Sequence, residues 1–365
     1  MEYGVDPGDY PLPAAFFEVP SSAVDRTKIS DYLKSRLIFE SSRNSLWIPV
    51  QFIRLMQKDA WMDEQNIGWF QKLLKNTRKT WTYTYKNFTL NMGQKPLLMG
   101  IVNVTPDSFS DGGRYFKADR AVNHVEEMVA SGVDMVDIGA ESSRPGAEQV
   151  DEKEEWRRLK PVLEQLKEKG LMEKTIISVD TYKAEIARKS LEMGVQIIND
   201  ISAGNMDPEM PDVVAEYNCP YIMMHMQGTP ADMQKNPHYE HLMDEILDFF
   251  DQKINQALKK GIRQIILDPG IGFGKRVEDN YEIIRRLPEL KQLGFPVLLG
   301  ASRKSFLWRK LKIEPKDADN STIVANSLGV LNGADILRIH HVSNHTELVN
   351  VIQWIQYNKA GIAEN

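Results

Sequence analysis

Seven polar residues follow short apolar runs, at positions where they could bind and activate a substrate. They are Asn103, Asp180, Asn199, Asp268, Lys304, Arg338 and His340. A single Asp or Asn at the end of an apolar run is often structural, because a folded core can satisfy it with hydrogen bonds. Seven such residues after six of the apolar runs predict one shared site.

The residue types indicate a flat heterocycle as ligand. Asp180, Asn199 and Asp268 offer hydrogen-bond acceptors and an amide donor at fixed positions. A pterin or a purine, whose edge displays both donors and acceptors, suits such a set.

A second group indicates an anion. Arg338 and His340 alternate around Ile339, so both side chains point to the same face of a strand. Together with Asn103 and Ser143 they could hold a phosphate or diphosphate. The run Ser302-Arg303-Lys304-Ser305 opens a predicted helix, and a helix N-terminus also favours an anion.

The elements that would carry these residues alternate regularly. Apolar runs bounded by turn residues are typical of buried parallel strands. They occur at residues 97–102, 135–138, 175–179, 195–198, 221–224, 264–267, 295–300 and 335–337. Helical patterns lie between them, including residues 118–131, 153–169, 184–193 and 240–260.

Eight alternations over roughly 250 residues predict a TIM (β/α)8 barrel of the α/β class. The catalytic rim of such a barrel lies at the carboxyl ends of its strands, where the seven polar residues stand. The rival is a doubly wound open sheet, which usually has a glycine-rich first turn. None follows the first strand.

The N-terminal part has a different pattern. Residues 1–25 contain four prolines and predict an extended arm, and residues 28–75 have helical spacing. The strict alternation of residues 81–85 predicts a strand, and a hairpin continuing through Phe88 and Leu90 could close the barrel floor. We therefore divide the chain into a mainly helical extension, residues 1–85, of unknown role and a barrel, residues 86–365.

Composition limits the partners and the compartment that we expect for this protein. The 365 residues carry a net charge of −6, from 45 basic and 51 acidic side chains, which argues against a nucleic-acid binder. The single cysteine, Cys219, excludes an intrachain disulfide. We see neither a secretory signal at the N-terminus nor an apolar stretch that could span a bilayer, and we expect a cytosolic protein.

Two polar loops, residues 105–113 and 142–146, could act as mobile lids over a substrate, or be ordinary surface connections. The glycine-rich segment at 270–275 is only superficially similar to a phosphate-binding loop, because it lacks the P-loop spacing.

Four motifs resemble the signatures of the dihydropteroate synthase family. In chain order they are Asn103-Val104-Thr105-Pro106-Asp107-Ser108-Phe109-Ser110-Asp111-Gly112-Gly113, Glu141-Ser142-Ser143-Arg144-Pro145-Gly146, Asp268-Pro269-Gly270-Ile271-Gly272-Phe273-Gly274 and Ser302-Arg303-Lys304-Ser305. The first is long and highly specific, and the resemblance extends over about residues 86–358.

The resemblance implies a homodimeric TIM barrel. Members of this family join 4-aminobenzoate to 6-hydroxymethyl-7,8-dihydropterin diphosphate with the help of Mg²⁺, and sulfonamides inhibit them by mimicking 4-aminobenzoate. It also implies roles for the residues. The pterin would bind Asp180, Asn199, Asp268 and Lys304. The diphosphate would bind Asn103, Ser143, Arg338 and His340, with Asn103 near the metal. The 4-aminobenzoate would bind Ser143, Arg144, Pro145, Phe273, Lys304 and Ser305.

The chemistry agrees with these roles. Diphosphate leaves readily once Mg²⁺, Arg338 and His340 neutralise its charge. Asp180 or Asp268 could then stabilise the cationic pterin methylene, and the amine attacks. No nucleophilic side chain is required.

Two positions depart from the family. Ser143 stands where Thr is usual, which keeps the hydroxyl and removes a methyl group. His341 stands where Asp is usual after the last-strand histidine, and we expect a modest effect because it should point away from His340.

Two other interpretations remain possible. A pterin-binding methyltransferase shares the barrel and the pterin-facing residues, but lacks the loop at 103–113 and the run at 302–305. A catalytically silent paralogue could bind pterin and regulate a partner, and a turnover assay separates it from an enzyme.

Overall fold

The computed structural model describes residues 80–105, 114–142 and 149–357, together with the backbone of three strands nearer the N-terminus. Eight parallel strands form its centre. They are β6 (Leu97–Asn103), β7 (Met135–Gly139), β8 (Ile176–Asp180), β9 (Ile197–Asp200), β10 (Tyr221–Met224), β11 (Ile265–Asp268), β12 (Leu298–Leu299) and β13 (Ile336–Ile339).

The strands close into a barrel. Their order is β11-β10-β9-β8-β7-β6-β13-β12, so β11 and β12 end the sheet. A parallel bridge pairs Leu267 of β11 with Val297, just before β12, and the Leu267 amide donates to the Pro296 carbonyl at 2.9 Å. This contact joins the two ends, and the TIM-barrel prediction is confirmed.

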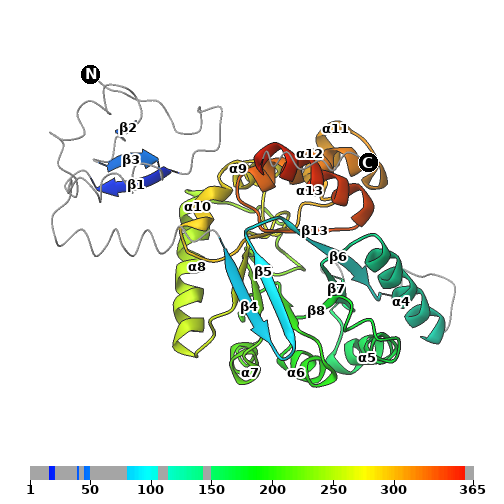
Figure 1. Cartoon of the computed structure of the whole chain (residues 1–365). Helices are drawn as coiled ribbons and strands as arrows, with labels where there is room; N and C mark the ends of the chain where they lie inside the picture. The colour runs from blue at the N-terminus through cyan, green and yellow to red at the C-terminus, as the bar shows by residue number, and fades with distance from the viewer. Residues whose placement is uncertain are drawn as a thin grey trace.

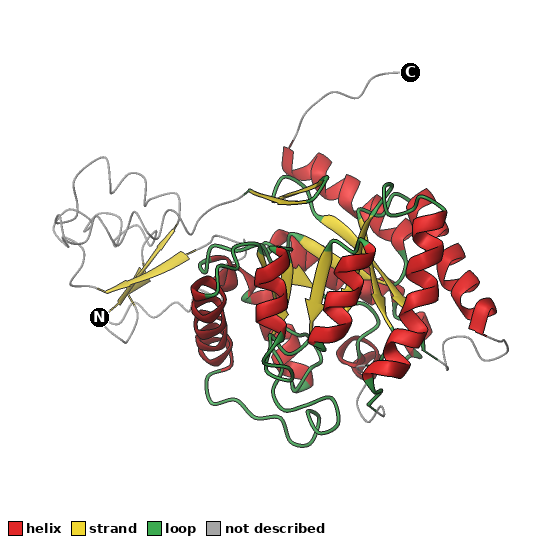
Figure 2. Ribbon diagram, turned by 90° about the horizontal axis from the view of Figure 1, so that it is seen from below, coloured by secondary structure: helices red, strands yellow, loops and turns green. Residues whose placement is uncertain are grey.

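Helices surround the strands (Figure 2). They are α4 (Arg114–Ala130), α5 (Glu152–Glu168), α6 (Ala184–Met193), α7 (Met210–Tyr217), α8 (Leu242–Lys259), α9 (Val277–Arg285), α10 (Leu287–Lys291), α11 (Ser305–Leu311), the 3-10 turn η4 (Pro315–Asp317), α12 (Asp319–Leu331) and α13 (Val342–Tyr357). None of the described helices is long and apolar enough to cross a bilayer.

Side chains alternate between two apolar layers, as the two-residue period of a strand requires. Leu98, Val136 and Ile177 pack in the large cluster that also holds helical side chains. Met99 and Met135 belong to a second cluster that takes one or two residues from each of several strands. Both faces of each strand are therefore buried, which explains the continuous apolar runs in the sequence.

A hairpin closes one end of the barrel. Strands β4 (Trp81–Tyr85) and β5 (Phe88–Met92) pair side by side (Figure 1). Their inward residues, Trp81 and Leu90 among them, join the second cluster. The Trp81 Nε1 donates to the Gly294 carbonyl at 2.9 Å and the Tyr83 hydroxyl to that of Ile265 at 2.7 Å. The predicted floor hairpin is confirmed, and the boundary at residues 85 and 86 falls within it.

Three short strands lie in the N-terminal extension. They are β1 (Phe16–Pro20), β2 (Phe39–Glu40) and β3 (Ser45–Pro49), paired in the antiparallel order β1-β3-β2. The helical prediction for residues 28–75 was wrong for β2 and β3, because sheet pairing overrides a weak local pattern. The apolar stripe predicted at residues 67–74 lies outside the described residues.

Candidate active site

Barrel register aligns the predicted rim residues. Asn103 pairs with Gly139, Gly139 with Asp180, and Asp180 with Asn199 on four successive strands. Gly139 contributes no side chain at this level, between Asn103 and Asp180. A Cβ added there would lie 3.4 Å from the Asp180 Cβ and 3.8 Å from the Asn103 Oδ1. The four strand ends therefore present one continuous polar level.

Arg338 reaches this level from β13 and binds two carboxylates. Its Nε donates to the Asp137 Oδ2 at 2.7 Å and its Nη2 to the Asp180 Oδ2 at 2.8 Å. The Asn199 Nδ2 donates to the same Asp137 oxygen at 2.9 Å. Four side chains from four strands thus form one network, with the fully buried Asp137 at its centre.

Burial dominates the electrostatics of this network. It raises the pKa of Asp180 to about 7, even though the Arg338 charge opposes the shift. The pKa of Arg338 is raised, because attraction to Asp137 and Asp180 outweighs the cost of burying the guanidinium. The site thus holds one permanent cation and a carboxyl group that titrates near neutrality.

His340 is surrounded by cationic side chains at the rim, those of Arg338, Arg303 and Lys304. Burial, followed by repulsion from Arg338, lowers its pKa to about 3. Its Nδ1 lies 2.9 Å from the Ser302 Oγ, and its backbone amide donates to that oxygen at 3.3 Å. The predicted role of His340 in neutralising diphosphate charge stays a prediction.

Asp268, Lys304 and Phe273 form the opposite side of the site. The Asp268 Oδ1 accepts the Gly270 amide at 2.7 Å, and burial raises the pKa of its carboxyl group. The Lys304 Nζ lies 4.0 Å from the centroid of the Phe273 ring. Burial, reinforced by Arg338, lowers the pKa of Lys304 to about 8. An apolar ring, an ammonium group and a carboxyl group thus lie together.

The glycine-rich segment after β11 is held against the neighbouring loop. A Cβ on Gly270 would lie 1.9 Å from the His225 carbonyl oxygen, and one on Gly274 would lie 2.3 Å from that of Gln227. The Lys275 Nζ is buried, 3.0 Å from the His225 Nδ1 and 3.0 Å from the Phe273 carbonyl oxygen. These glycines permit close backbone approach, and Lys275 fastens the two loops together.

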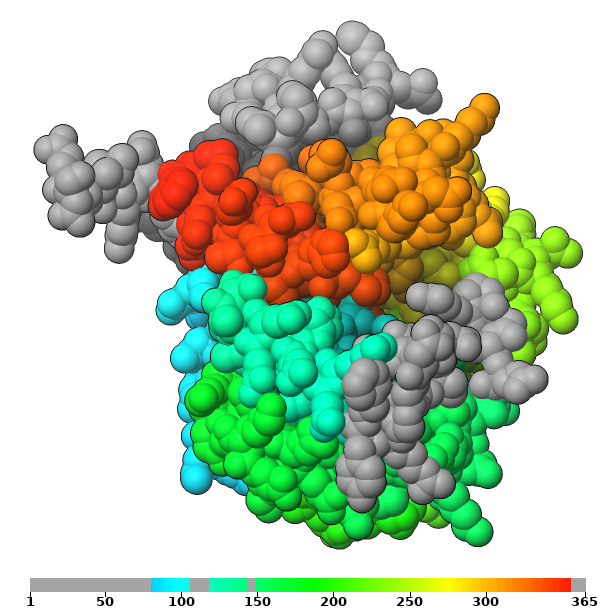
Figure 3. Space-filling view, turned by 90° about the vertical axis from the view of Figure 1, so that its right-hand side faces the viewer, coloured from blue at the N-terminus to red at the C-terminus, as the bar shows by residue number. Residues whose placement is uncertain are grey.

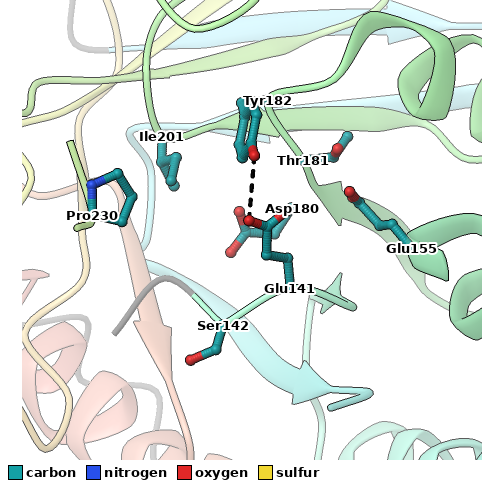
Figure 4. Close-up of a pocket in the computed structure, with 8 residues that line it drawn as sticks. All are labelled: Glu141, Ser142, Glu155, Asp180, Thr181, Tyr182, Ile201 and Pro230. Atoms are coloured by element: carbon teal, nitrogen blue, oxygen red, sulfur yellow. Dashed lines mark hydrogen bonds between the residues drawn. The ribbon is translucent and has the colours of Figure 1, made fainter. Parts of the chain in front are cut away.

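A pocket opens beside Asp180 (Figure 4). The Tyr182 hydroxyl donates to the Glu141 Oε1 at 3.2 Å across it. Lys183 bonds to both Glu141 and the buried Glu155. These bonds raise the pKa of Lys183 although burial opposes it. The pocket therefore has a charged, firmly held wall next to the rim.

Several predicted residues cannot be placed. Ser143, Arg144 and Pro145 lie outside the described residues, as does most of the first predicted lid, residues 106–113. Ser305 is the first residue of α11 and is half-buried. The roles assigned to all the site residues stay predictions.

The sequence analysis missed two residues of the candidate site, Asp137 and Ser302. Asp137 is a charged residue inside an apolar strand, two positions before Gly139 on the same face, and this pattern could have revealed it. Ser302 was considered only as part of a helix start. Nothing local in the sequence indicates its contact with His340, which lies 38 residues away.

Known proteins are similar to this chain in sequence and in fold. Residues 99–340 match the family described as pterin binding enzyme. The dihydropteroate synthase of Synechocystis is 42% identical over 262 residues, which cover 71% of this chain and 90% of that protein.

Two solved structures of dihydropteroate synthases have a fold similar to that of this chain. That of the Xanthomonas albilineans dihydropteroate synthase with 4-aminobenzoic acid is 39% identical, with a TM-score of 0.68, and the match covers 73% of this chain and 95% of that one. That of the Yersinia pestis enzyme with a sulfonamide drug is 37% identical, with a TM-score of 0.71, and the match covers 76% and 100%. The chain thus belongs to the pterin-binding enzymes and, among them, to the dihydropteroate synthases, which are transferases.

Proposed function

We propose that this chain joins 4-aminobenzoate to 6-hydroxymethyl-7,8-dihydropterin diphosphate, giving 7,8-dihydropteroate and diphosphate. The observation that carries the proposal is the rim network of Arg338, Asp137, Asp180 and Asn199. It provides donors and acceptors for a pterin edge beside a cation for a leaving anion.

The pterin ring binds between the carboxyl groups of Asp180 and Asp268. Asn199 and Asp180 face it from one side, and Asp268 and Lys304 from the other. Both carboxyl groups have raised pKa values because burial disfavours their charge, so a ring N–H group that donates to them replaces lost solvation. Lys304 donates to the ring carbonyl.

The diphosphate binds Arg338, His340 and Asn103. The guanidinium has five N–H donors, and its bonds to Asp137 and Asp180 use two of them, leaving others for phosphate oxygens. His340 adds a hydrogen bond. Ser143 would supply a hydroxyl group.

Mg²⁺ fits beside Asn103. No group of three or more His, Cys, Asp or Glu side chains in the described ranges could hold a metal by itself. Mg²⁺ needs no such group, since it usually takes one or two protein oxygens together with substrate phosphates and water. The Asn103 amide oxygen, next to the open Gly139, is a hard ligand of this kind. When bound, the metal would neutralise charge on the departing diphosphate.

The 4-aminobenzoate binds over Phe273. This ring lies in an apolar cluster with Ile201, Met224 and Met233 that suits an aromatic substrate. Lys304 lies at the ring, and Ser305, Ser143, Arg144 and Pro145 complete the proposed site.

The residues then act by stabilising charge. The bond between the methylene carbon and the diphosphate oxygen breaks, and its electron pair leaves with the diphosphate. Asp180 or Asp268 stabilises the cationic methylene group, and the amine lone pair forms the new C–N bond as the amine releases a proton to solvent. Sulfonamides are expected to compete at the 4-aminobenzoate site.

Purified full-length protein given the pterin diphosphate and Mg²⁺ tests this function. We expect diphosphate release coupled to dihydropteroate formation that depends on 4-aminobenzoate. Pterin binding without product would contradict the proposal and favour the silent paralogue. Methyl transfer to or from a pterin would favour the methyltransferase.

We also propose a homodimer joined through α12 and α13. These helices contact one another and lie at the surface in orange and red (Figure 3). Six exposed apolar side chains repeat at helical spacing along them: Val324, Leu328, Leu331, Val351, Trp354 and Ile355. A patch of this kind on a folded chain is typical of a protein interface, and a two-fold axis lets the same patch bury itself.

The proposed compartment is the cytosol. The one cysteine, Cys219, is a buried free thiol, so the fold has no use for an oxidising environment. Cell fractionation with an antibody to the chain tests this, and recovery in a membrane or secreted fraction would contradict it.

A further inference from the structure

Arg303, Asp319 and His341 form a hydrogen-bonded cluster beside the rim. They come from the turn after β12, the first residue of α12 and the segment after β13. The Arg303 Nε and Nη2 donate to the two Asp319 oxygens at 2.9 and 3.1 Å. The His341 Nδ1 lies 2.9 Å from the Asp319 Oδ2, and its Nε2 lies 3.0 Å from the Arg303 Nη2.

His341 contacts both of the other members through its ring nitrogens. Each of the three side chains therefore touches the other two, and the cluster joins three segments of the chain. Although His341 follows His340 directly, it therefore does more than point away from the site.

The cluster holds a turn with an unusual backbone. Arg303 has a φ of +53°, in the left-handed region that is costly for a residue with a Cβ. Its backbone amide donates to the Thr322 Oγ1 at 3.1 Å, so both its side chain and its backbone are tied to α12. Such a conformation persists only where its surroundings impose it.

The two residues that flank Arg303 both belong to the site. Ser302 contacts His340 through its hydroxyl, and Lys304 reaches the Phe273 ring. A change in the backbone at Arg303 would displace both side chains together. The same cluster holds the backbone that follows His340 through His341.

We propose that Asp319 is a positioning residue that fixes Ser302, Lys304 and His340 through Arg303 and His341. It touches no substrate, and its effect on turnover rests on the function proposed above. The carboxylate on α12 is the common partner of the other two members, so its removal releases both.

The test compares Asp319→Ala with Asp317→Ala in the full chain. Asp317 is an exposed carboxylate in η4, just before α12, and serves as the matched control. We expect Asp319→Ala to lower kcat/KM for the pterin diphosphate at least tenfold, with KM raised, at temperatures well below its Tm. The control should stay within twofold of the unmodified chain. A lowered Tm with unchanged kcat and KM would show a merely structural role and overturn the proposal.

A rescue variant sharpens the test. The His Nδ1 and an Asp oxygen are both attached to Cγ, and the His341 Nδ1 already lies 3.4 Å from the Arg303 Nη2. A carboxylate at position 341 can therefore bind Arg303 in place of Asp319. We expect Asp319→Ala/His341→Asp to recover kcat/KM to within about threefold of the unmodified chain. A double variant as slow as Asp319→Ala would overturn the proposal.

A readout that needs no turnover separates this proposal from the proposed function. In ¹⁵N NMR spectra, the ring nitrogens of His340 should shift in Asp319→Ala and return in the double variant, because the Ser302 contact depends on the turn. An unmodified chain without synthase activity would contradict the proposed function alone. An unchanged His340 spectrum in Asp319→Ala would contradict the positioning role.

Discussion

At the scale of single residues, Arg338 pairs with two carboxyl groups, the buried Asp137 and the half-buried Asp180. Asp137 is 0% exposed, and its charge is balanced by this guanidinium. We expect Arg338→Ala to lose at least a hundredfold in turnover, because a phosphate donor is removed. Breaking a buried ion pair costs about 3–5 kcal/mol of unfolding free energy, so urea denaturation should show that loss too.

A second variant isolates the buried charge. Arg338→Met/Asp137→Asn removes both partners of this ion pair and should regain part of the stability without regaining turnover, because Asp180 still loses its guanidinium partner. Unchanged stability in Arg338→Ala would show that Asp137 does not depend on the guanidinium for its charge balance.

The pH dependence of kcat/KM follows from two groups whose pKa values are shifted. Asp180 gains its charge as pH rises through about 7, and Lys304 loses its charge as pH rises through about 8. If catalysis uses the carboxylate and the ammonium group, kcat/KM rises through the first value and falls beyond the second. Initial rates from pH 5.5 to 9.5 measure this. Asp180→Asn should lack the acid limb, and a flat profile would contradict both roles.

At the scale of elements, the hairpin of β4 and β5 packs against the inner apolar layer of the strands at the floor of the barrel. Trp81 is 2% exposed, and its ring packs with apolar residues of the strands. Trp81→Ala should lower the unfolding free energy by about 3–5 kcal/mol, the usual cost of removing a large buried aromatic side chain.

The matched control is Thr89→Ala, on the exposed face of β5. It should change stability by less than about 0.5 kcal/mol. Because the rim lies at the other ends of the strands, KM should stay unchanged in both variants while they are folded. A Trp81→Ala protein as stable as the control would show that the hairpin is not part of the core.

At the scale of the whole molecule, the exposed stripe on α12 and α13 predicts how two copies meet. Trp354 is 71% exposed, and Leu328 lies on the neighbouring helix. We expect Leu328→Glu/Trp354→Glu to be monomeric by light scattering, since buried charges would oppose the contact. Asn87→Glu, in the exposed hairpin turn, is the control and should remain dimeric. A monomeric unmodified chain would exclude the proposed dimer.

The N-terminal extension provides none of the described rim residues. A chain that starts at residue 80 keeps the whole hairpin and every described strand of the barrel. We expect it to retain kcat/KM within about tenfold. Complete loss of activity in a folded protein, checked by circular dichroism, would show that the extension completes the site.

Local patterns in the sequence determined the barrel. Apolar runs, their polar ends and the alternation at residues 81–85 all depend on the strand and helix periods, which neighbours in sequence set. The strands and the floor hairpin were predicted for this reason, and the rim residues that the structure describes lie where the pattern put them. In the extension, where β2 and β3 depend on pairing across a sheet, the local pattern failed.

Only the tertiary structure decided the pKa shifts and the contact partners of the site residues. Asp137 and Arg338 are 201 positions apart, and the cluster of Arg303, Asp319 and His341 joins three separate segments. The lowered pKa of His340 likewise depends on burial and on neighbouring cations. A sequence shows which groups are present, but their charges and contacts follow from the distances and the solvent exclusion that folding creates.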